Sequence, residues 1–308
     1  MRAARDWEAD FARWARPPSE SEEERCENAV GGIRDAIAGS AALREHDVKV
    51  FVQGSYRNRV NVRQDSDVDV GVLCHDVFLS QLPPGRVRED FGIVDAGYGV
   101  TQFKTEVEDA LVAHFGRAAV IRGSKAFDVN ANSYHVEADV VPLVEYRRYW
   151  EDGSFRAGVA LLPDGASDWI KNFPERLVDH WPPVPLHYEN GVSKNTATGR
   201  GFKGIVRILK YIRNEMAERG YAVARPVPGY LLECLAWNAP NACYVGDTWD
   251  ARVQAVVLHL WSNTKDDAAC LSWCEVDDIK YLFRTSQPWT REQAHEFISS
   301  AWDYVGVR

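Results

Sequence analysis

The segment QGSYRNRVNVRQDSDVDVGVL, residues 53–73, decides how the rest of this 308-residue chain is interpreted. Its second half, DVDVGVL (67–73), alternates acidic and apolar residues and predicts a strand. Residues two apart in a strand point to the same face, so Asp67 and Asp69 are expected to project together. Two carboxylates held this close repel each other unless a cation offsets their charge. The segment therefore predicts a divalent metal site.

A third carboxylate is expected on a neighbouring strand, within YHVEADVVPLVEY (134–146). Asp139 is the best candidate, because Glu137 and Asp139 share one strand face and Pro142 then ends regular pairing. Magnesium prefers hard oxygen ligands, usually a few carboxylates together with substrate phosphates and water. Asp139 therefore completes the predicted ligand set.

A Gly-Ser turn precedes the acidic strand and predicts a phosphate-binding loop at Gln53, Gly54 and Ser55. Glycine lets a phosphate approach the backbone, and the serine N–H and hydroxyl can both donate hydrogen bonds to it. Taken alone, the acidic alternation is typical of a solvated strand face and the Gly-Ser pair of an ordinary turn. The combination of Gly-Ser, Asp-x-Asp and a distal Asp favours a nucleotide and metal site over a solvated strand face and an ordinary turn.

Composition restricts the class of protein. Hydrophobic residues make up 45% and charged residues 26% of the chain, and the formal net charge is −9. This balance is typical of a globular protein and argues against a surface that grips nucleic acid. No segment has the length of apolar sequence that a signal peptide or a membrane span needs. The six cysteines are scattered, so we expect reduced thiols, a cytoplasmic location and no structural metal or disulfide.

The chain changes character near residue 150, from mixed α/β to helical. We therefore expect a catalytic core over 1–160 and a helical lobe over 161–308, packed around a cleft. The predicted strands are 46–53, 67–73, 125–130 and 134–146. The predicted helices are 20–45, 101–116, 168–181, 202–219, 229–237, 249–263 and 290–302.

These motifs resemble the polymerase-β superfamily of nucleotidyltransferases, whose signature is GS…DxD followed by a distal Asp. More narrowly, the chain is similar to the bacterial cGAS/DncV-like nucleotidyltransferases (CD-NTases), and within them to clade E. The resemblance is carried by QGSYRNRVNVRQDSDVDV, HVEADVVPLVEYRRY, WIKNFPERL, FKGIVRILKYIRNEM and YLLECLAWNAPN. It implies an α/β fold, a mixed sheet with flanking helices packed against a C-terminal helical lobe, with the active site in the cleft between them.

The resemblance also implies a metal-dependent chemistry. Asp67, Asp69 and Asp139 would hold two Mg²⁺ ions, with Mn²⁺ as a substitute, and Asp139 would assist deprotonation of the acceptor hydroxyl.

Three residues outside the acidic strands match nucleotide-contacting positions of relatives. Lys203 matches a donor-phosphate contact, with a solvated lysine as the alternative. Tyr230 matches a base-stacking aromatic, with a core aromatic as the alternative. It follows Gly229, where relatives often carry a serine that meets phosphate. Asn172 matches a base-contacting position whose asparagine accompanies pyrimidine use in clade E, because an amide can read the edge of uracil; the alternative is a helix-start residue before Pro174.

The implied activity is synthesis of a cyclic oligonucleotide second messenger from NTPs, with ATP and UTP as the expected substrates and pyrophosphate as the leaving group. The product is expected to contain uridine, as in cyclic UMP–AMP or cyclic di-UMP. The implied setting is anti-phage (CBASS) signalling, with a separate effector that binds the product and a partner acting at the C-terminal tail. No nucleic-acid activator and no membrane are expected. The alternatives are a transferase that acts on RNA ends or on a protein, and an inactive nucleotide-binding module.

Overall fold

A computed structural model describes residues 5–62, 67–95, 97–172 and 186–306. Its contacts divide the chain into two compact units. The sheet unit comprises 19–57 and 66–185, and the helical unit comprises 1–18, 58–65 and 186–308.

The sheet unit contains a seven-stranded mixed sheet in the order β1-β2-β5-β4-β3, with β6 pairing with β5 and β7 with β6. Only β2 and β5 run parallel among these paired strands; the other pairs are antiparallel. The strands are β1 (Val48–Val52), β2 (Val68–Gln81), β3 (Val120–Arg122), β4 (Phe127–Val129), β5 (Ala138–Tyr149), β6 (Phe155–Leu161) and β7 (Ile170–Asn172). The helices are α2 (Glu20–Gly39), α3 (Gly54–Arg57) and α4 (Val100–Phe115), with 3-10 turns η1 (Leu43–Glu45) and η2 (Arg88–Phe91).

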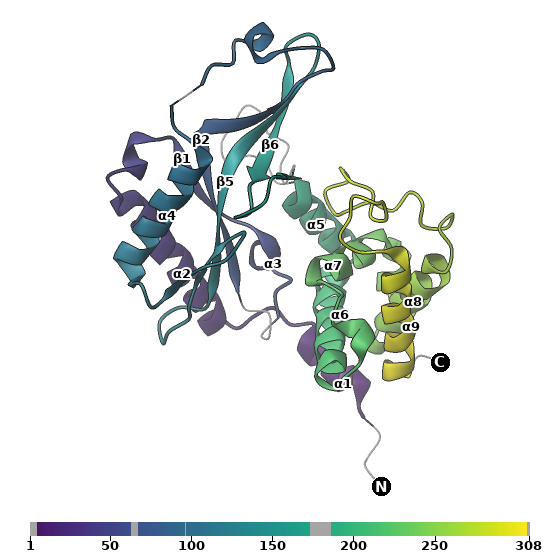
Figure 1. Cartoon of the computed structure of the whole chain (residues 1–308). Coiled ribbons are helices and arrows are strands. Elements are labelled where there is room, and N and C mark those ends of the chain that lie inside the picture. Colours follow the sequence, from purple (N-terminus) through teal and green to yellow (C-terminus); the bar gives the residue numbers. More distant parts are fainter. Residues whose placement is uncertain (1–4, 63–66, 96, 173–185, 307–308) are drawn as a thin grey trace. The chain divides into compact units, whose positions relative to one another are not determined.

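One face of the sheet is covered by α2 and α4, as Figure 1 shows. Ser19 begins α2 with a capping box in which its side chain and that of Glu22 each accept a backbone N–H. The Gly31-Gly32 pair does not interrupt the helix, because Gly32 lies against the Phe115 ring of α4 and leaves no room for a side chain. Close packing of the two helices therefore explains the glycine.

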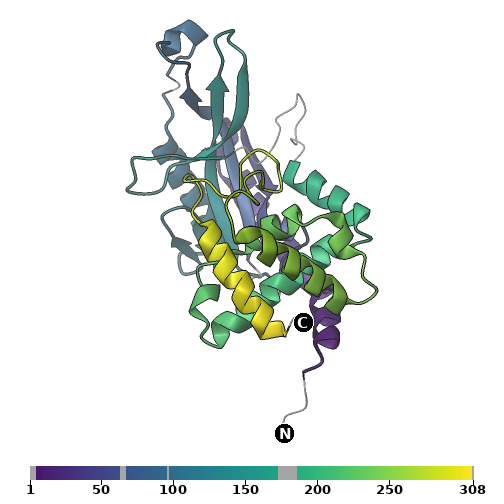
Figure 2. The ribbon, with the colours of Figure 1, turned by 90° about the vertical axis from the view of Figure 1, so that its right-hand side faces the viewer.

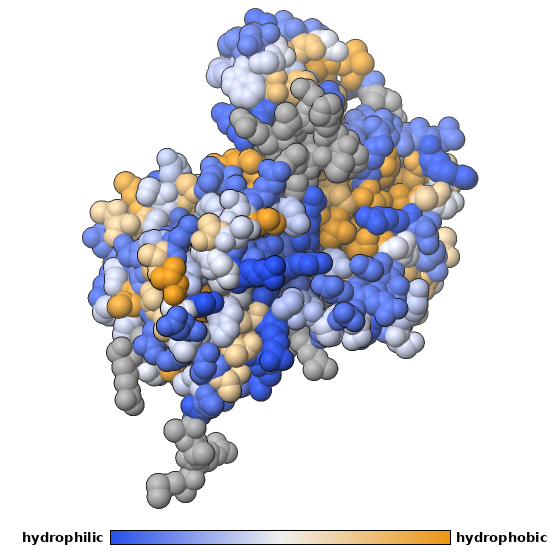
Figure 3. Space-filling view, turned by 180° about the vertical axis from the view of Figure 1, so that it is seen from behind, coloured by the Kyte–Doolittle hydropathy of each residue, from blue (hydrophilic) through white to orange (hydrophobic). Residues whose placement is uncertain are grey.

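The opposite face of the sheet carries the acidic residues and a smaller apolar cluster. That cluster consists of Leu73, Leu143, Val159 and Leu161, with Phe51, Val141 and Ile170 partly buried against it. Figure 3, seen from behind, shows hydrophobic residues gathered on one part of the surface of the sheet unit. The period-two alternation of β2 and β5 produces this division, because successive side chains point to opposite faces.

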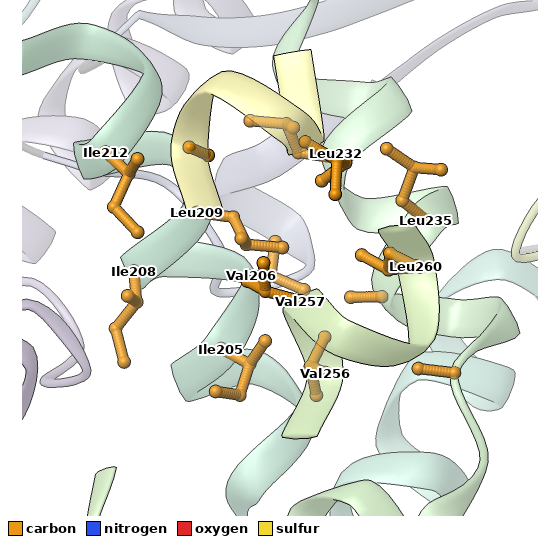
Figure 4. Packing of buried hydrophobic residues seen from close by; sticks show 14 of the residues in the cluster. Ile205, Val206, Ile208, Leu209, Ile212, Leu232, Leu235, Val256, Val257 and Leu260 are labelled. Carbon is orange, nitrogen blue, oxygen red and sulfur yellow. The ribbon is translucent and has the colours of Figure 1, made fainter. Parts of the chain in front are cut away.

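The helical unit packs around α6, whose apolar face is buried along its whole length. Figure 4 shows Ile205 and Leu209 of this helix among side chains of α7 and α8 in one hydrophobic core. Helices α8 and α9 lie side by side (Figure 2). The helices are α1 (Trp7–Trp14), α5 (Leu186–Ala197), α6 (Gly201–Glu218), α7 (Gly229–Asn238), α8 (Trp249–Thr264) and α9 (Arg291–Val305), with 3-10 turns η3 (Ala222–Ala224) and η4 (Asn241–Tyr244).

The units differ from the expected division at residue 160 in three ways. Strand β7 stays with the sheet unit, because it pairs with β6, which pairs with β5 along Val144–Tyr149. The segment 58–65 belongs to the helical unit. Helix α1 joins the helical unit, because Phe11 and Trp14 are buried in its core. The prediction of a helix over 168–181 is wrong at its start, because strand β7 lies there and pairs with β6. Residues 173–181 lie outside the described residues.

No helix in the described part of the chain is long and apolar enough to cross a membrane.

Candidate active site

A row of carboxylates crosses three neighbouring strands on one face of the sheet. Asp69 of β2 is the register partner of Asp139 of β5, and Asp139 is in turn the partner of Asp128 of β4. Register partners share a face and have Cβ atoms about 5 Å apart. Asp67 directly precedes β2, two residues before Asp69, and its side chain is exposed. The pairing of β2 with β5 thus brings all three predicted acids together.

The predicted Gly-Ser turn lies against this row. Gly54 has φ of +69°, and a Cβ at this position would overlap the Asp69 carboxylate. Only glycine fits both conditions, since other residues rarely adopt this φ and any side chain would displace Asp69. The Gln53 backbone N–H donates to the Asp69 carbonyl at 2.9 Å. Ser55 lies in the short helix α3. The turn and the acids are therefore one local structure.

The environment of Asp139 is electrostatically unfavourable for a carboxylate. Burial, the charges of Asp128, Asp67 and Glu137, and a hydrogen bond with Asp128 raise the pKa of Asp139 to about 6. These causes all disfavour the ionised form. A cation bound on this face would reverse their effect.

Asp128 is a member of the row that the sequence analysis did not single out. Its strand was expected, and Asp128 lies between the buried Phe127 and Val129. The same alternation that identified Asp67 and Asp69 was therefore available at this strand. The sequence could not show that Asp128 lies beside Asp139, because the antiparallel pairing of β4 with β5 depends on the fold.

The donor set of the row fits a divalent cation by its chemistry, because it consists of carboxylate oxygens on one face. Among the described residues, no three His, Cys, Asp or Glu side chains already form a closed metal cluster.

The helical unit contains the other two predicted contacts, Lys203 and Tyr230. Lys203 lies in the first turn of α6, and only 9% of it is exposed, which contradicts the alternative of a solvated lysine. Tyr230 lies in the first turn of α7 and donates from its hydroxyl to Glu275 Oε2 at 3.1 Å. Its ring contacts those of His187 and Trp289 at centroid distances of 5.4 and 6.1 Å. Tyr230 is thus held in place from several sides.

A second lysine of α6, Lys210, is buried as well. It is only 3% exposed, and a Cβ at Gly229 would lie 3.3 Å from its Nζ. The ammonium group therefore rests on the first turn of α7, beside the position where relatives often carry serine. Its spacing of seven residues from Lys203, two helical turns, was the sequence signal that could have paired them.

Asn172 ends β7, and its backbone is the register partner of Val159 in β6. Its side chain lies outside the described part of the structure, so its predicted contact with a base stays a prediction.

A mixed sheet with Gly-Ser and three acids on adjoining strands, joined to a helical unit, defines a nucleotidyltransferase of the polymerase-β type. The family model for the "cGAS/DncV-like nucleotidyltransferase C-terminal helical domain" matches residues 189–306. A cyclic dipyrimidine nucleotide synthase CdnE from Legionella pneumophila is 41% identical over 304 residues, covering 97% of this chain and 98% of the relative.

Two further comparisons agree. A cyclic dipyrimidine nucleotide synthase CdnE from Cecembia lonarensis is 38% identical over 299 residues, covering 97% of this chain and 98% of the relative. The solved structure of the Rhodothermus marinus CdnE c-UMP-AMP synthase with Apcpp and Upnpp has a TM-score of 0.80 and 29% identity, covering 97% of this chain and 96% of that chain. The chain therefore belongs to the bacterial cGAS/DncV-like nucleotidyltransferases, in their CdnE group, clade E.

Proposed function

We propose that this protein joins two NTPs into a cyclic dinucleotide that contains at least one pyrimidine, and that it releases pyrophosphate at each step. The observation that carries the proposal is the carboxylate row, with Gly54 packed against Asp69. Two similar proteins named as cyclic dipyrimidine nucleotide synthases support two pyrimidines in the product. The Rhodothermus marinus protein, named a c-UMP-AMP synthase, supports uridine together with adenosine as the alternative.

The chemistry follows from the acids. A ribose hydroxyl of one nucleotide attacks the α-phosphorus of the other, a new P–O bond forms, and the bond to pyrophosphate breaks. Asp67, Asp69 and Asp139 would hold two Mg²⁺ ions, or Mn²⁺ in their place, which when bound supply charge neutralisation for the triphosphate. Asp139 would accept the proton of the attacking hydroxyl as a general base.

The remaining predicted residues would bind and orient the nucleotides. The backbone of Gln53, Gly54 and Ser55 would meet phosphate oxygens beside the acids. On the helical unit, Lys203 would pair with the donor triphosphate and Tyr230 would stack on a base.

Asn172 is proposed as the residue that selects a pyrimidine. Its amide offers both a donor and an acceptor to the base edge. Replacement by Ser, the residue common in purine-using relatives, should shift the products towards purines.

The proposed setting is anti-phage signalling in the bacterial cytoplasm, in which the cyclic product activates a separate effector. The net charge of −9 supports an enzyme that needs no nucleic-acid activator.

A product assay tests the proposal. The protein is incubated with Mg²⁺ and all four NTPs, treated with phosphatase, and the resistant products are identified by mass spectrometry. A cyclic product with one or two pyrimidines, absent from an Asp67→Asn/Asp69→Asn variant, is expected. A linear tail on added RNA, or nucleotide transfer to a protein, would replace this function with one of its alternatives. Binding of NTP and metal without pyrophosphate release would indicate an inactive nucleotide-binding module.

A further inference from the structure

The two buried lysines of α6 share one buried carboxylate, Glu233 of α7. Glu233 is 2% exposed, and its Oε1 lies 2.9 Å from His187 Nε2 at the start of α5. Lys203 and Lys210 both lie close enough to lower its pKa. One carboxylate thus meets three basic groups from two other helices.

The charges in this cluster depend on one another. Burial would raise the pKa of Glu233, but His187, Lys210 and Lys203 together lower it below its ordinary value. Burial lowers the pKa of Lys203. The charge of Glu233 raises this pKa, whereas the charges of Arg207 and Arg59 lower it further. Among these neighbouring charges, Glu233 is the one that favours the positive form of Lys203.

The cluster lies at the first turn of α7. Lys210 rests on Gly229, and Tyr230 follows directly, so the ammonium group and the proposed stacking aromatic adjoin each other. A buried carboxylate near two buried lysines offsets part of the cost of burying their charges.

We propose that Glu233 is a positioning residue, the shared counter-ion that keeps Lys203 and Lys210 charged and oriented towards the triphosphate of the bound nucleotide. That the lysines bind a triphosphate rests on the proposed function. The ion cluster itself is observed independently of that function. Glu233 acts only through the lysines and touches no reacting atom.

The first test is Glu233→Gln, which keeps the shape of the side chain and removes its charge. KM for the NTP is expected to rise about tenfold, with a much smaller change in kcat, because ground-state binding is lost. Glu215→Gln is the matched control: Glu215 lies on α6 and binds Arg5 at 2.8 Å, so the same change breaks an ion pair elsewhere in the helical unit. An unchanged or lower KM in Glu233→Gln would overturn the proposal.

The second test is the pH profile of kcat/KM. Glu233 raises the pKa of Lys203, so its loss should move the alkaline limb to lower pH. The other titratable groups facing the cluster are His187, Tyr230 and Cys234 and the acids Glu275 and Asp277. His187→Gln should leave the alkaline limb in place, because His187 is neutral at high pH. A limb that stays in place in Glu233→Gln would contradict the proposal.

A stability cycle keeps the proposal testable without activity. Glu233→Gln leaves buried lysines without their counter-ion and should lower the melting temperature strongly, whereas Glu233→Gln/Lys203→Met removes both charges and should recover most of the loss. Additive losses would overturn the inference. A wild-type protein that makes no product while the cycle shows rescue would reject the proposed function alone.

Discussion

Asp139 of the sheet unit is a half-buried acid and Glu233 of the helical unit is a fully buried one, and their electrostatic surroundings are opposite. Burial and three neighbouring acids raise the pKa of Asp139 to about 6. Glu233 is more deeply buried, yet His187, Lys210 and Lys203 lower its pKa. The difference lies in the partners: the helical unit supplies its own cations, whereas the sheet unit gathers acids beside acids.

The comparison separates two kinds of polar burial. A compensated acid such as Glu233 holds side chains in place. An acid such as Asp139, whose pKa is raised by neighbouring acids, carries a cost that an external cation can remove. The sheet unit is therefore the place where metal and substrate phosphates should alter the protein most.

The largest expected effect comes from removing one acid of the row. Asp69→Asn should lower kcat by about 1,000-fold or more, because the variant loses charge where the metal and triphosphate meet. Pyrophosphate release is the measurement. Asp76→Asn is the control, since Asp76 lies further along β2 and binds His46 instead. Equal activity of the two variants would contradict the assignment of the row.

Gly54→Ala should lower activity by about 100-fold, because the new methyl group overlaps the Asp69 carboxylate and displaces it. Gly31→Ala is the matched control. Gly31 lies within α2 with no atom near its missing Cβ, so the change should stabilise the protein by about 1 kcal/mol and leave activity unchanged. A Gly54→Ala enzyme with normal kcat would show that the turn does not position Asp69.

Two substitutions of Asp by Asn should shift the melting temperature of the metal-free protein in opposite directions. The folded-state pKa of Asp139 is raised from 3.8 to about 6, so its ionised form costs stability as pH rises through that range. Asp139→Asn should therefore raise the melting temperature by about 3 °C at pH 8, which corresponds to about 1 kcal/mol after allowance for solvent screening.

For Asp164, substitution by Asn should change the melting temperature in the opposite direction. A hydrogen bond from Arg122 at 2.6 Å, with a smaller contribution from Lys104, lowers the pKa of Asp164 to about 2. Its contribution to stability is present above pH 3.8 and is lost as pH falls through about 2. Asp164→Asn should lower the melting temperature at pH 8, because the buried Lys104 loses its partner. Shifts of the same sign in both variants would contradict the comparison.

The smallest expected effect is that of Tyr230→Phe. The ring stays, but its hydroxyl no longer donates to Glu275, which keeps its bond from Gln287 Nε2 at 2.7 Å. The free energy of unfolding should fall by about 1 kcal/mol and KM should rise about threefold. Tyr230→Leu, which removes the stacking surface as well, should raise KM further. Identical KM values for the two variants would indicate a core aromatic without a role in binding.

Local periodicity in the sequence was enough to predict the acidic strands and most of the helices. The alternation of DVDVGVL placed Asp67 and Asp69 on one face, and YHVEADVVPLVEY predicted the strand of Asp139; both strands are confirmed. The expectation that Pro142 ends regular pairing is wrong, because Pro142 is the register partner of Val72 and β5 continues to Tyr149. The helices of the helical unit at 202–219, 229–237, 249–263 and 290–302 are confirmed within two or three residues, because each has an apolar stripe of helical period.

Features that depend on non-local pairing could not be read from the sequence. Asp128 joins the row only because β4 pairs antiparallel with β5. Lys210 resembles a solvated lysine in sequence, and it is buried because α7 supplies Glu233 beside it. The segment IKN forms strand β7 instead of the start of a helix, because it pairs with β6.

The most direct test of the central claim is the effect of Mg²⁺ on the melting temperature at two pH values. At pH 8, where Asp139 is ionised, Mg²⁺ should stabilise the wild-type protein by binding to the folded row. At pH 5 the shift should be much smaller, because Asp139 is protonated, and Asp139→Asn should show a small shift at both values. Equal stabilisation of wild type and variant at both pH values would show that the acid row is not the cation site.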